Sequence, residues 1–216
     1  MDTLRTFIAI EIPANVRASI ADHINRLRRE CPDVGASWTR EDNLHLTLKF
    51  LGEVAITRVP ALSDAAAKAA RSIEPFSLLI SGCGSFPSHG KPKVLWVGVS
   101  SETPADRGPQ AASPLGADAG GFEPEGRTST LEQLHTAIED ECTDADFERD
   151  SRAFHPHLTI ARVRKPKGIG RLVETHRTLN FPSHDFVVGE IVVFKSELLR
   201  QGSKHTALSR HQLGTK

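Results

Sequence analysis

The chain has 216 residues, 38% hydrophobic and 25% charged, which is the composition of an ordinary globular protein and not of a fibre or a disordered chain. Lys plus Arg and Asp plus Glu both number 27, so net charge gives no argument for binding a long polyanion, and any nucleic-acid contact should be local. The three cysteines lack metal-binding spacing and predict neither a disulfide framework nor a cysteine zinc site. The N-terminal apolar run is too short for a signal peptide or a membrane span, so we expect a cytoplasmic protein without membrane contact.

The first half of the chain predicts a strand, a helix, a strand and a second helix. An alternating β-branched run predicts the strand over 7–12, and Pro13 then suits the first turn of a helix. The apolar stripe of that helix is Val16, Ile20, Ile24 and Leu27. A strand beginning at His45 follows, and an alanine-rich helix is predicted over 59–73.

The second half repeats this order after an additional strand. Strands are predicted over 76–80 and 93–99, and the stretch 101–127, poor in large apolar residues, predicts a mobile surface insertion within a single domain spanning 1–216. Ser129 with Glu132 forms a capping box that opens the next helix. The remaining predicted elements are a strand from His157, a short helix over 172–176, and strands over 186–188 and 190–194.

Two tetrapeptides of one design carry the chemistry: His45-Leu46-Thr47-Leu48 and His157-Leu158-Thr159-Ile160. In an extended chain alternate side chains share a face, so each histidine lies beside a threonine and opposite two apolar residues. Alternation also places Lys49 on the histidine face and Phe50 in the core, which leaves Trp38 as the stronger candidate to stack a base. It puts Arg162 opposite His157 unless the strand bulges near Ala161.

The two halves share the order strand, helix, His-x-Thr strand, which is a weak internal repeat of architecture. If the halves pack about a pseudo-twofold axis, the two motif faces converge on one cleft. An imidazole titrates near neutral pH and a hydroxyl both donates and accepts hydrogen bonds, so converging pairs would suit an anion and its protons.

These segments resemble the two-histidine phosphoesterase superfamily, and within it the RNA 2',3'-cyclic phosphodiesterases, historically called 2'-5' RNA ligases. The matching segments are RTFIAI at 5–10, LHLTLKFLG at 44–52, GCGSFP at 82–87, VLWVG at 94–98, FHPHLTIAR at 154–162 and FKSEL at 194–198. The resemblance implies an α+β fold that is bilobal, with two antiparallel sheets lining a central cleft and helices outside. The chain departs from the family in its long insertion and in His205, which stands where the family usually has a tyrosine.

The resemblance also implies roles. His45 is expected to donate a proton to the leaving 3' oxygen and His157 to accept one from water, giving a 2'-phosphate end. Thr47, Thr159 and Arg162 are expected to bind the phosphate. We expect no cofactor and no metal, an RNA partner with a cyclic phosphate end, for instance one derived from tRNA, and a monomer, since one chain supplies the whole cleft.

Three alternatives stay open. The same site could act on a small cyclic nucleotide, or bind RNA ends or nucleotides without turnover. A zinc hydrolase that uses both motif histidines as ligands is a third alternative, although no third carboxylate ligand is evident. The same chemistry with an RNA hydroxyl as nucleophile would be a reversible 2'-5' ligation.

Overall fold

A computed structural model describes residues 2–88, 90–101, 128–165, 167–199 and 202–215, so the predicted insertion lies outside the described residues except for its first residue. The elements in chain order are β1 (Thr3–Glu11), α1 (Ala14–Glu30), β2 (Ala36–Trp38), β3 (His45–Ala55), α2 (Val59–Arg71), β4 (Phe76–Phe86), β5 (Val94–Ser100), α3 (Thr130–Asp144), β6 (His157–Val163), α4 (Ile169–Leu179), β7 (His184–Val188), β8 (Glu190–Leu199) and β9 (Gly202–Gln212), with short 3-10 turns at Glu41–Asn43 and Ile56–Arg58. The capping box predicted at Ser129 is present, because its hydroxyl accepts from the backbone of Glu132 while the Glu132 carboxylate accepts from the backbone of Ser129.

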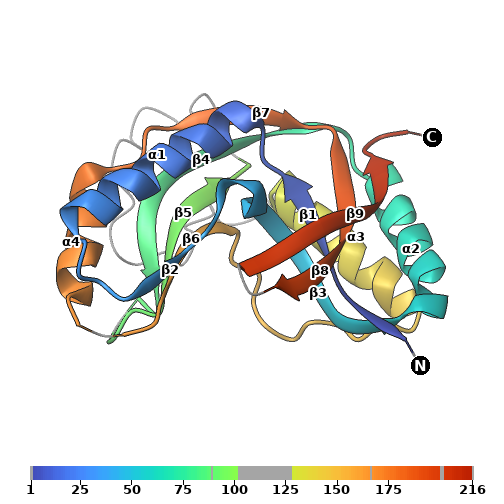
Figure 1. Ribbon diagram of the computed structural model, residues 1–216. Helices are drawn as coiled ribbons and strands as arrows, with labels where there is room; N and C mark the ends of the chain where they lie inside the picture. Colours follow the sequence, from blue (N-terminus) through green and yellow to red (C-terminus); the bar gives the residue numbers. More distant parts are fainter. Residues whose placement is uncertain (1, 89, 102–127, 166, 200–201, 216) are drawn as a thin grey trace.

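The strands form two antiparallel sheets, as expected for the α+β architecture (Figure 1). One sheet has the order β3-β1-β8-β9 and the other the order β2-β6-β5-β4-β7. The four strands of the first sheet, in the order β3-β1-β8-β9, correspond one to one with β6-β5-β4-β7 of the second sheet, in which β2 is an added edge strand. Each His-x-Thr strand therefore pairs with the strand that opens its own half, which confirms the repeat of architecture predicted from sequence.

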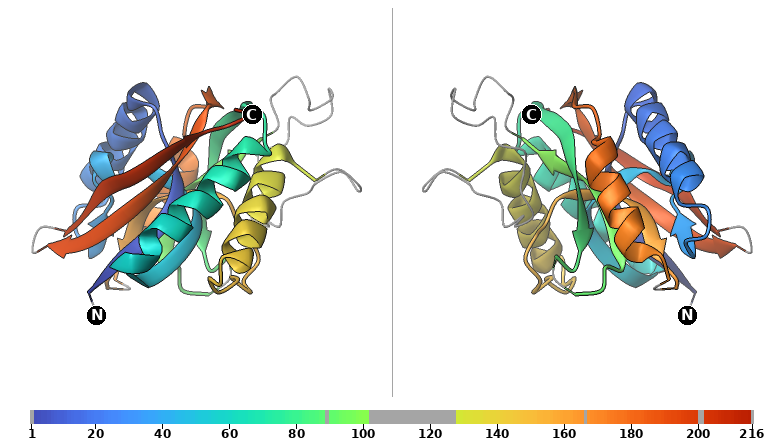
Figure 2. Two further views of the ribbon diagram at one scale, coloured as in Figure 1. Left: turned by 90° about the vertical axis from the view of Figure 1, so that its right-hand side faces the viewer. Right: turned by 90° about the vertical axis from the view of Figure 1, so that its left-hand side faces the viewer.

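The helices lie outside the sheets and are exchanged between the two halves. Helix α1 follows β1 of the first sheet but packs beside α4, while α3 follows β5 of the second sheet but packs against α2 and β3 (Figure 2). One core of buried apolar residues runs continuously through both sheets and all four of these helices. The exchange thus ties the halves together. Among the described residues, no helix is both long enough and apolar enough to cross a membrane.

Candidate functional site

Each His-x-Thr motif stands at the start of its strand and turns its polar side chains away from the core. Leu46 and Leu158 are fully buried in the continuous core, while the histidine and threonine on either side of each are partly exposed. On β3 the polar face adjoins a small separate cluster of Phe7, Ala9, Val192 and Phe194. Both predicted polar faces are therefore present, on the side of each sheet opposite the core.

A bulge in β3 overturns the predicted alternation just after the motif. The pairing with β1 shifts between Ile8 and Ala9, so that Thr47 lies opposite Ala9 and Lys49 lies opposite Ile8, with Leu48 as the extra residue. Lys49 consequently points into the core side, where it is 2% exposed, whereas Phe50 is 54% exposed. The predictions that Lys49 shares the histidine face and that Phe50 is core were both wrong.

Strand β6 carries the same irregularity at the equivalent place. Its pairing with β5 shifts between Leu95 and Trp96, so Thr159 lies opposite Trp96 and Ala161 opposite Leu95. The extra residue puts Ala161 in the core and brings Arg162, which is exposed, to the face of His157. The sequence predicted that Arg162 would share the face of His157 only if the strand bulged near Ala161, and this bulge is present.

The two motif strands adjoin. Strands β3 and β6 are in contact, and the segment between β2 and β3 crosses from one sheet to the other. The Thr39 hydroxyl donates to the Thr159 carbonyl over 2.8 Å, and the Asn43 side chain donates to the Ser203 carbonyl of β9 over 2.8 Å. The segment between β2 and β3 therefore runs past the second motif strand immediately before it reaches His45.

A backbone carbonyl orients the second histidine. His157 Nδ1 lies 2.6 Å from the carbonyl oxygen of His155, and because a carbonyl only accepts, Nδ1 carries the hydrogen. In the neutral ring, Nε2 is then left with a free lone pair, the form that a proton acceptor needs. Burial lowers the pKa of His157, and the hydrogen bond to His155 opposes this in part.

The first histidine sits among aromatic rings. Its ring stacks on Phe7 with centroids 4.8 Å apart and meets the edge of His205 at 5.2 Å. Burial, together with the nearby His205, lowers the pKa of His45 to about 4, although its hydrogen bond to the backbone of Asn43 acts in the opposite direction. His205, the departure noted in the sequence, is therefore a direct neighbour of the motif.

Comparison with known proteins identifies the family. The model of the LigT-like phosphoesterases matches residues 10–96 and 122–205. The chain belongs to this family. An RNA 2',3'-cyclic phosphodiesterase of Thermotoga maritima is 27% identical over 206 residues, covering 95% of this chain and 93% of its own, and one of Methanothermobacter thermautotrophicus is 27% identical over 213 residues, covering 97% and 99%.

Solved structures of LigT-like proteins share the fold. A crystal structure of a Thermus thermophilus protein superposes with a TM-score of 0.71 at 23% identity and covers 98% of both chains. E. coli LigT complexed with 3'-AMP superposes with a TM-score of 0.68 at 25% identity, covering 99% of this chain and all of its own.

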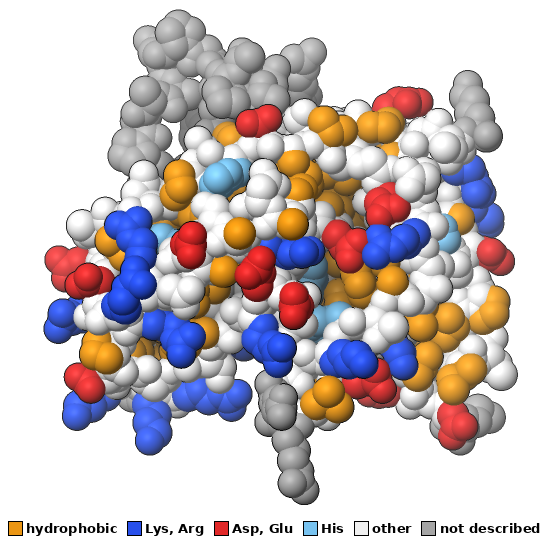
Figure 3. All heavy atoms as spheres, turned by 45° about the horizontal axis from the view of Figure 1, so that its top comes forward, with side chains coloured by type: hydrophobic (Ala, Val, Ile, Leu, Met, Phe, Trp, Pro, Cys, Tyr) orange, Lys and Arg blue, Asp and Glu red, His pale blue; other side chains and the backbone are white. Residues whose placement is uncertain are grey.

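Other candidate groups lie away from the motif face. Trp38 packs against the core and lines a hollow of about 730 Å³ beside Arg28 and Arg29 of α1, so it is not the exposed aromatic that Phe50 is. Acidic and basic side chains are interspersed on the face drawn in Figure 3, as the balanced charge predicts. Within the described chain, the one group of three possible metal ligands is His23, Cys83 and His176, which includes neither motif histidine.

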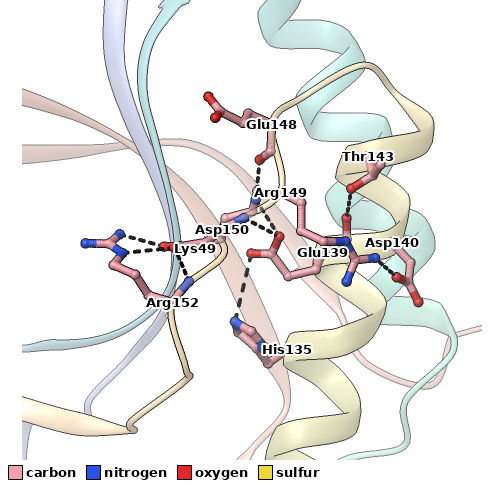
Figure 4. Close-up of polar contacts among 9 residues, drawn as sticks. All are labelled: Lys49, His135, Glu139, Asp140, Thr143, Glu148, Arg149, Asp150 and Arg152. Carbon is pink, nitrogen blue, oxygen red and sulfur yellow. Dashed lines mark hydrogen bonds and ion pairs between the residues drawn. The ribbon is translucent and has the colours of Figure 1, made fainter.

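A buried ion pair connects the motif strand to the loop that precedes β6. Lys49 Nζ donates to Glu139 Oε2 of α3 over 2.7 Å and to the Glu148 carbonyl over 2.8 Å. The same carboxylate oxygen accepts from the backbone N–H of Asp150 over 3.0 Å (Figure 4). The network fixes the path of the chain toward His157. The sequence analysis did not predict this network. Two signals could have indicated it: Lys49 stands inside an apolar strand, and Glu139 stands next to the apolar stripe of α3.

The lowered pKa values of His45 and His157 predict the pH range in which the enzyme loses activity. A proton donor must be protonated and an acceptor neutral, so with the pKa values of His45 and His157 both below 6.5, kcat/KM will fall about tenfold per pH unit above pH 6.5. A bound anionic phosphate raises the pKa of either imidazole. The two limbs of the pH profile of kcat will therefore lie at higher pH than those of kcat/KM. Replacing His205 with Phe removes the charge that His205 carries below its own lowered pKa, which is one cause of the low pKa of His45, and will increase kcat/KM on the acid side of pH 6.5.

Steady-state rates of the wild type and of His205→Phe between pH 4 and 9 check this. His211→Gln serves as the control, because His211 lies on the same strand but contacts Ser63 and Ser209. A profile of His205→Phe that matches the wild type below pH 6.5 would contradict the assigned influence of His205 on His45.

Proposed function

We propose that this LigT-like protein hydrolyses RNA 2',3'-cyclic phosphate ends to 2'-phosphomonoesters. The observation that carries the proposal is that each of two contacting strands places a histidine and a threonine together on its side away from the core. The names of the relatives, RNA 2',3'-cyclic phosphodiesterases, agree with this substrate class.

The chemistry uses the two imidazoles as acid and base. His157 Nε2 takes a proton from water, the water oxygen attacks phosphorus, the bond from phosphorus to O3' breaks, and His45 gives its proton to O3'. One proton enters His157 and one leaves His45, so exchange with solvent restores both. A neutral His157 fits the first role because burial lowers its pKa.

The phosphate requires donors for the charge that builds on its non-bridging oxygens. Thr47 and Thr159 offer hydroxyls beside the two imidazoles, and Arg162 offers a guanidinium on the face of His157. Phe50 presents an exposed ring on the side of β3 that carries His45, and E. coli LigT has been crystallised with a nucleotide, 3'-AMP. We assign to Phe50 the stacking role that was predicted for Trp38.

The product identifies the reaction. An oligoribonucleotide ending in a 2',3'-cyclic phosphate is incubated with the protein, with EDTA added at the start of the assay, and the monoester is identified by chromatography. A 2'-phosphate supports the assigned roles, and a 3'-phosphate would reverse the leaving group. Binding without product would favour the non-catalytic module, and loss of activity with EDTA would favour a metal hydrolase. Adding an RNA with a 5'-hydroxyl end tests the 2'-5' ligation.

Replacing Arg162 with Met will lower kcat/KM by roughly 10- to 100-fold, because a hydrogen bond to a charged group contributes about 1.5–3 kcal/mol. Arg164→Met is the matched control, since Arg164 is also exposed but donates to the Ser37 hydroxyl. Steady-state kinetics of both variants on the cyclic-phosphate RNA check the result. Equal losses in the two variants would assign Arg162 to general attraction of RNA and not to the phosphate.

A further inference from the structure

Three side chains able to ligate a metal meet between the second sheet and its helices. His23 comes from α1, Cys83 from β4 and His176 from α4, and their ligand atoms all lie within 4.8 Å of one another. Both histidines are buried and Cys83 is half-buried. A register shift in β4 at Gly82, which has φ 73°, turns Cys83 to the core side, opposite Val97. The position of Cys83 therefore depends on a bulge, as that of Arg162 does.

The spacing of the three atoms is close to that of one coordination sphere. His23 Nε2 and His176 Nδ1 are 2.9 Å apart, and Cys83 Sγ is 4.0 Å from His23 Nε2. In tetrahedral geometry, with nitrogen at about 2.0 Å and sulfur at about 2.3 Å from the ion, two nitrogens stand about 3.3 Å apart and a nitrogen and a sulfur about 3.5 Å apart. The third pair, Cys83 Sγ and His176 Nδ1, lies within 4.8 Å, so side-chain shifts of about 1 Å would bring all three atoms onto one ion.

The surroundings prepare these atoms for a cation. His176 Nε2 lies 3.0 Å from the Trp96 carbonyl and must donate to it, which leaves the Nδ1 lone pair facing His23. A carbonyl that holds the second nitrogen of a histidine is the usual support of a metal ligand. The Phe181 backbone hydrogen-bonds the Cys83 sulfur.

A hydrogen bond between two neutral histidines accounts for less of the arrangement. It needs one proton on His23 Nε2, and it leaves His23 Nδ1 buried without a partner in the described chain, as the metal-bound form would too. It also gives no role to the Cys83 thiol, which is directed at the same nitrogen.

We propose that His23, Cys83 and His176 bind a thiophilic d10 ion, Zn²⁺ or Cu⁺, which fastens α1 and α4 to the second sheet. On binding, the Cys83 thiol loses its proton, the His23 proton moves from Nε2 to Nδ1, and one bond to sulfur and two to nitrogen form. The net change is one proton released per ion. The role is structural, since neither motif histidine belongs to the cluster.

Metal titration of the chelator-treated, reduced full chain tests the proposal. We expect one Zn²⁺ or Co²⁺ per chain, with a thiolate-to-cobalt charge-transfer band, or one Cu⁺ under anaerobic conditions, and one proton released. At an ion concentration of a hundred times Kd, Tm should rise by roughly 5–10 °C. Binding of Cu⁺ alone would indicate a three-coordinate site, and binding of Zn²⁺ would indicate a fourth, exogenous ligand; both support the site.

Cys83→Ser should lose the charge-transfer band and the rise in Tm, and His176→Gln should weaken binding. Cys142→Ser is the matched control, because Cys142 is a buried thiol whose pKa burial likewise raises to about 11, but it lies on α3 outside the cluster. Absence of stoichiometric binding in the wild type would overturn the proposal. So would binding that Cys83→Ser leaves unchanged, which is readable even if His176→Gln fails to fold.

Discussion

Replacing His45 or His157 with alanine will lower kcat on the cyclic-phosphate RNA by roughly 10²- to 10⁴-fold, the usual contribution of a positioned acid or base. The fold should persist, because both side chains are partly exposed and neither belongs to the continuous core. In the pH profile, His157→Ala should lose the acid limb and His45→Ala the alkaline limb, since each limb reports the group that was removed. Single-turnover rates and thermal unfolding of both variants measure the two effects separately.

His155→Ala provides the control for this pair. The His155 side chain is exposed, and it is the carbonyl of His155, not its ring, that holds the His157 imidazole. The variant should keep the rate within a few-fold of the wild type. If His157→Ala kept a tenth or more of the wild-type rate, the proton acceptor would have to be sought elsewhere. The double variant should lose less than the product of the single losses, because acid and base act in one step.

The polar faces of the two motifs were predictable because a period of two needs only the local extended conformation. His-x-Thr alternates with leucines that must be buried, so the face of each histidine follows from sequence. The register shifts after Thr47 and Thr159 were not predictable in the same way, because a bulge is a property of a pair of strands. It was the shift that buried Lys49, exposed Phe50 and turned Arg162 toward His157.

The edge strand β9 was the other feature that could not be predicted from the sequence. Strand β9 runs from Gly202 to Gln212 with almost no apolar periodicity, because it lies at an edge and most of its residues stay at least partly exposed. Without that strand, nothing in the sequence brought His205 to His45. The cluster of His23, Cys83 and His176 joins residues up to 153 positions apart on three elements, so it too required the tertiary structure.

Replacing Lys49 with Met will destabilise the protein by about 3–5 kcal/mol, because it leaves the Glu139 carboxylate buried without its counter-charge. The two side chains are 1% and 3% exposed, so water cannot take the place of the missing ammonium group. For a chain of this size the loss corresponds to a fall in Tm of roughly 6–20 °C. Denaturant unfolding gives the free energy, and differential scanning calorimetry gives Tm.

The exposed pair Lys68–Glu141 on α2 and α3 is the matched control, since it also ends on α3 but has a lysine that is 61% exposed. Lys68→Met should cost at most about 1 kcal/mol. Combining Lys49→Met with Glu139→Gln should recover part of the loss, because glutamine carries no charge and still accepts from the Asp150 N–H. A double variant no more stable than Lys49→Met alone would mean that Lys49 acts through its hydrogen bond to the Glu148 carbonyl and not through the charge of Glu139.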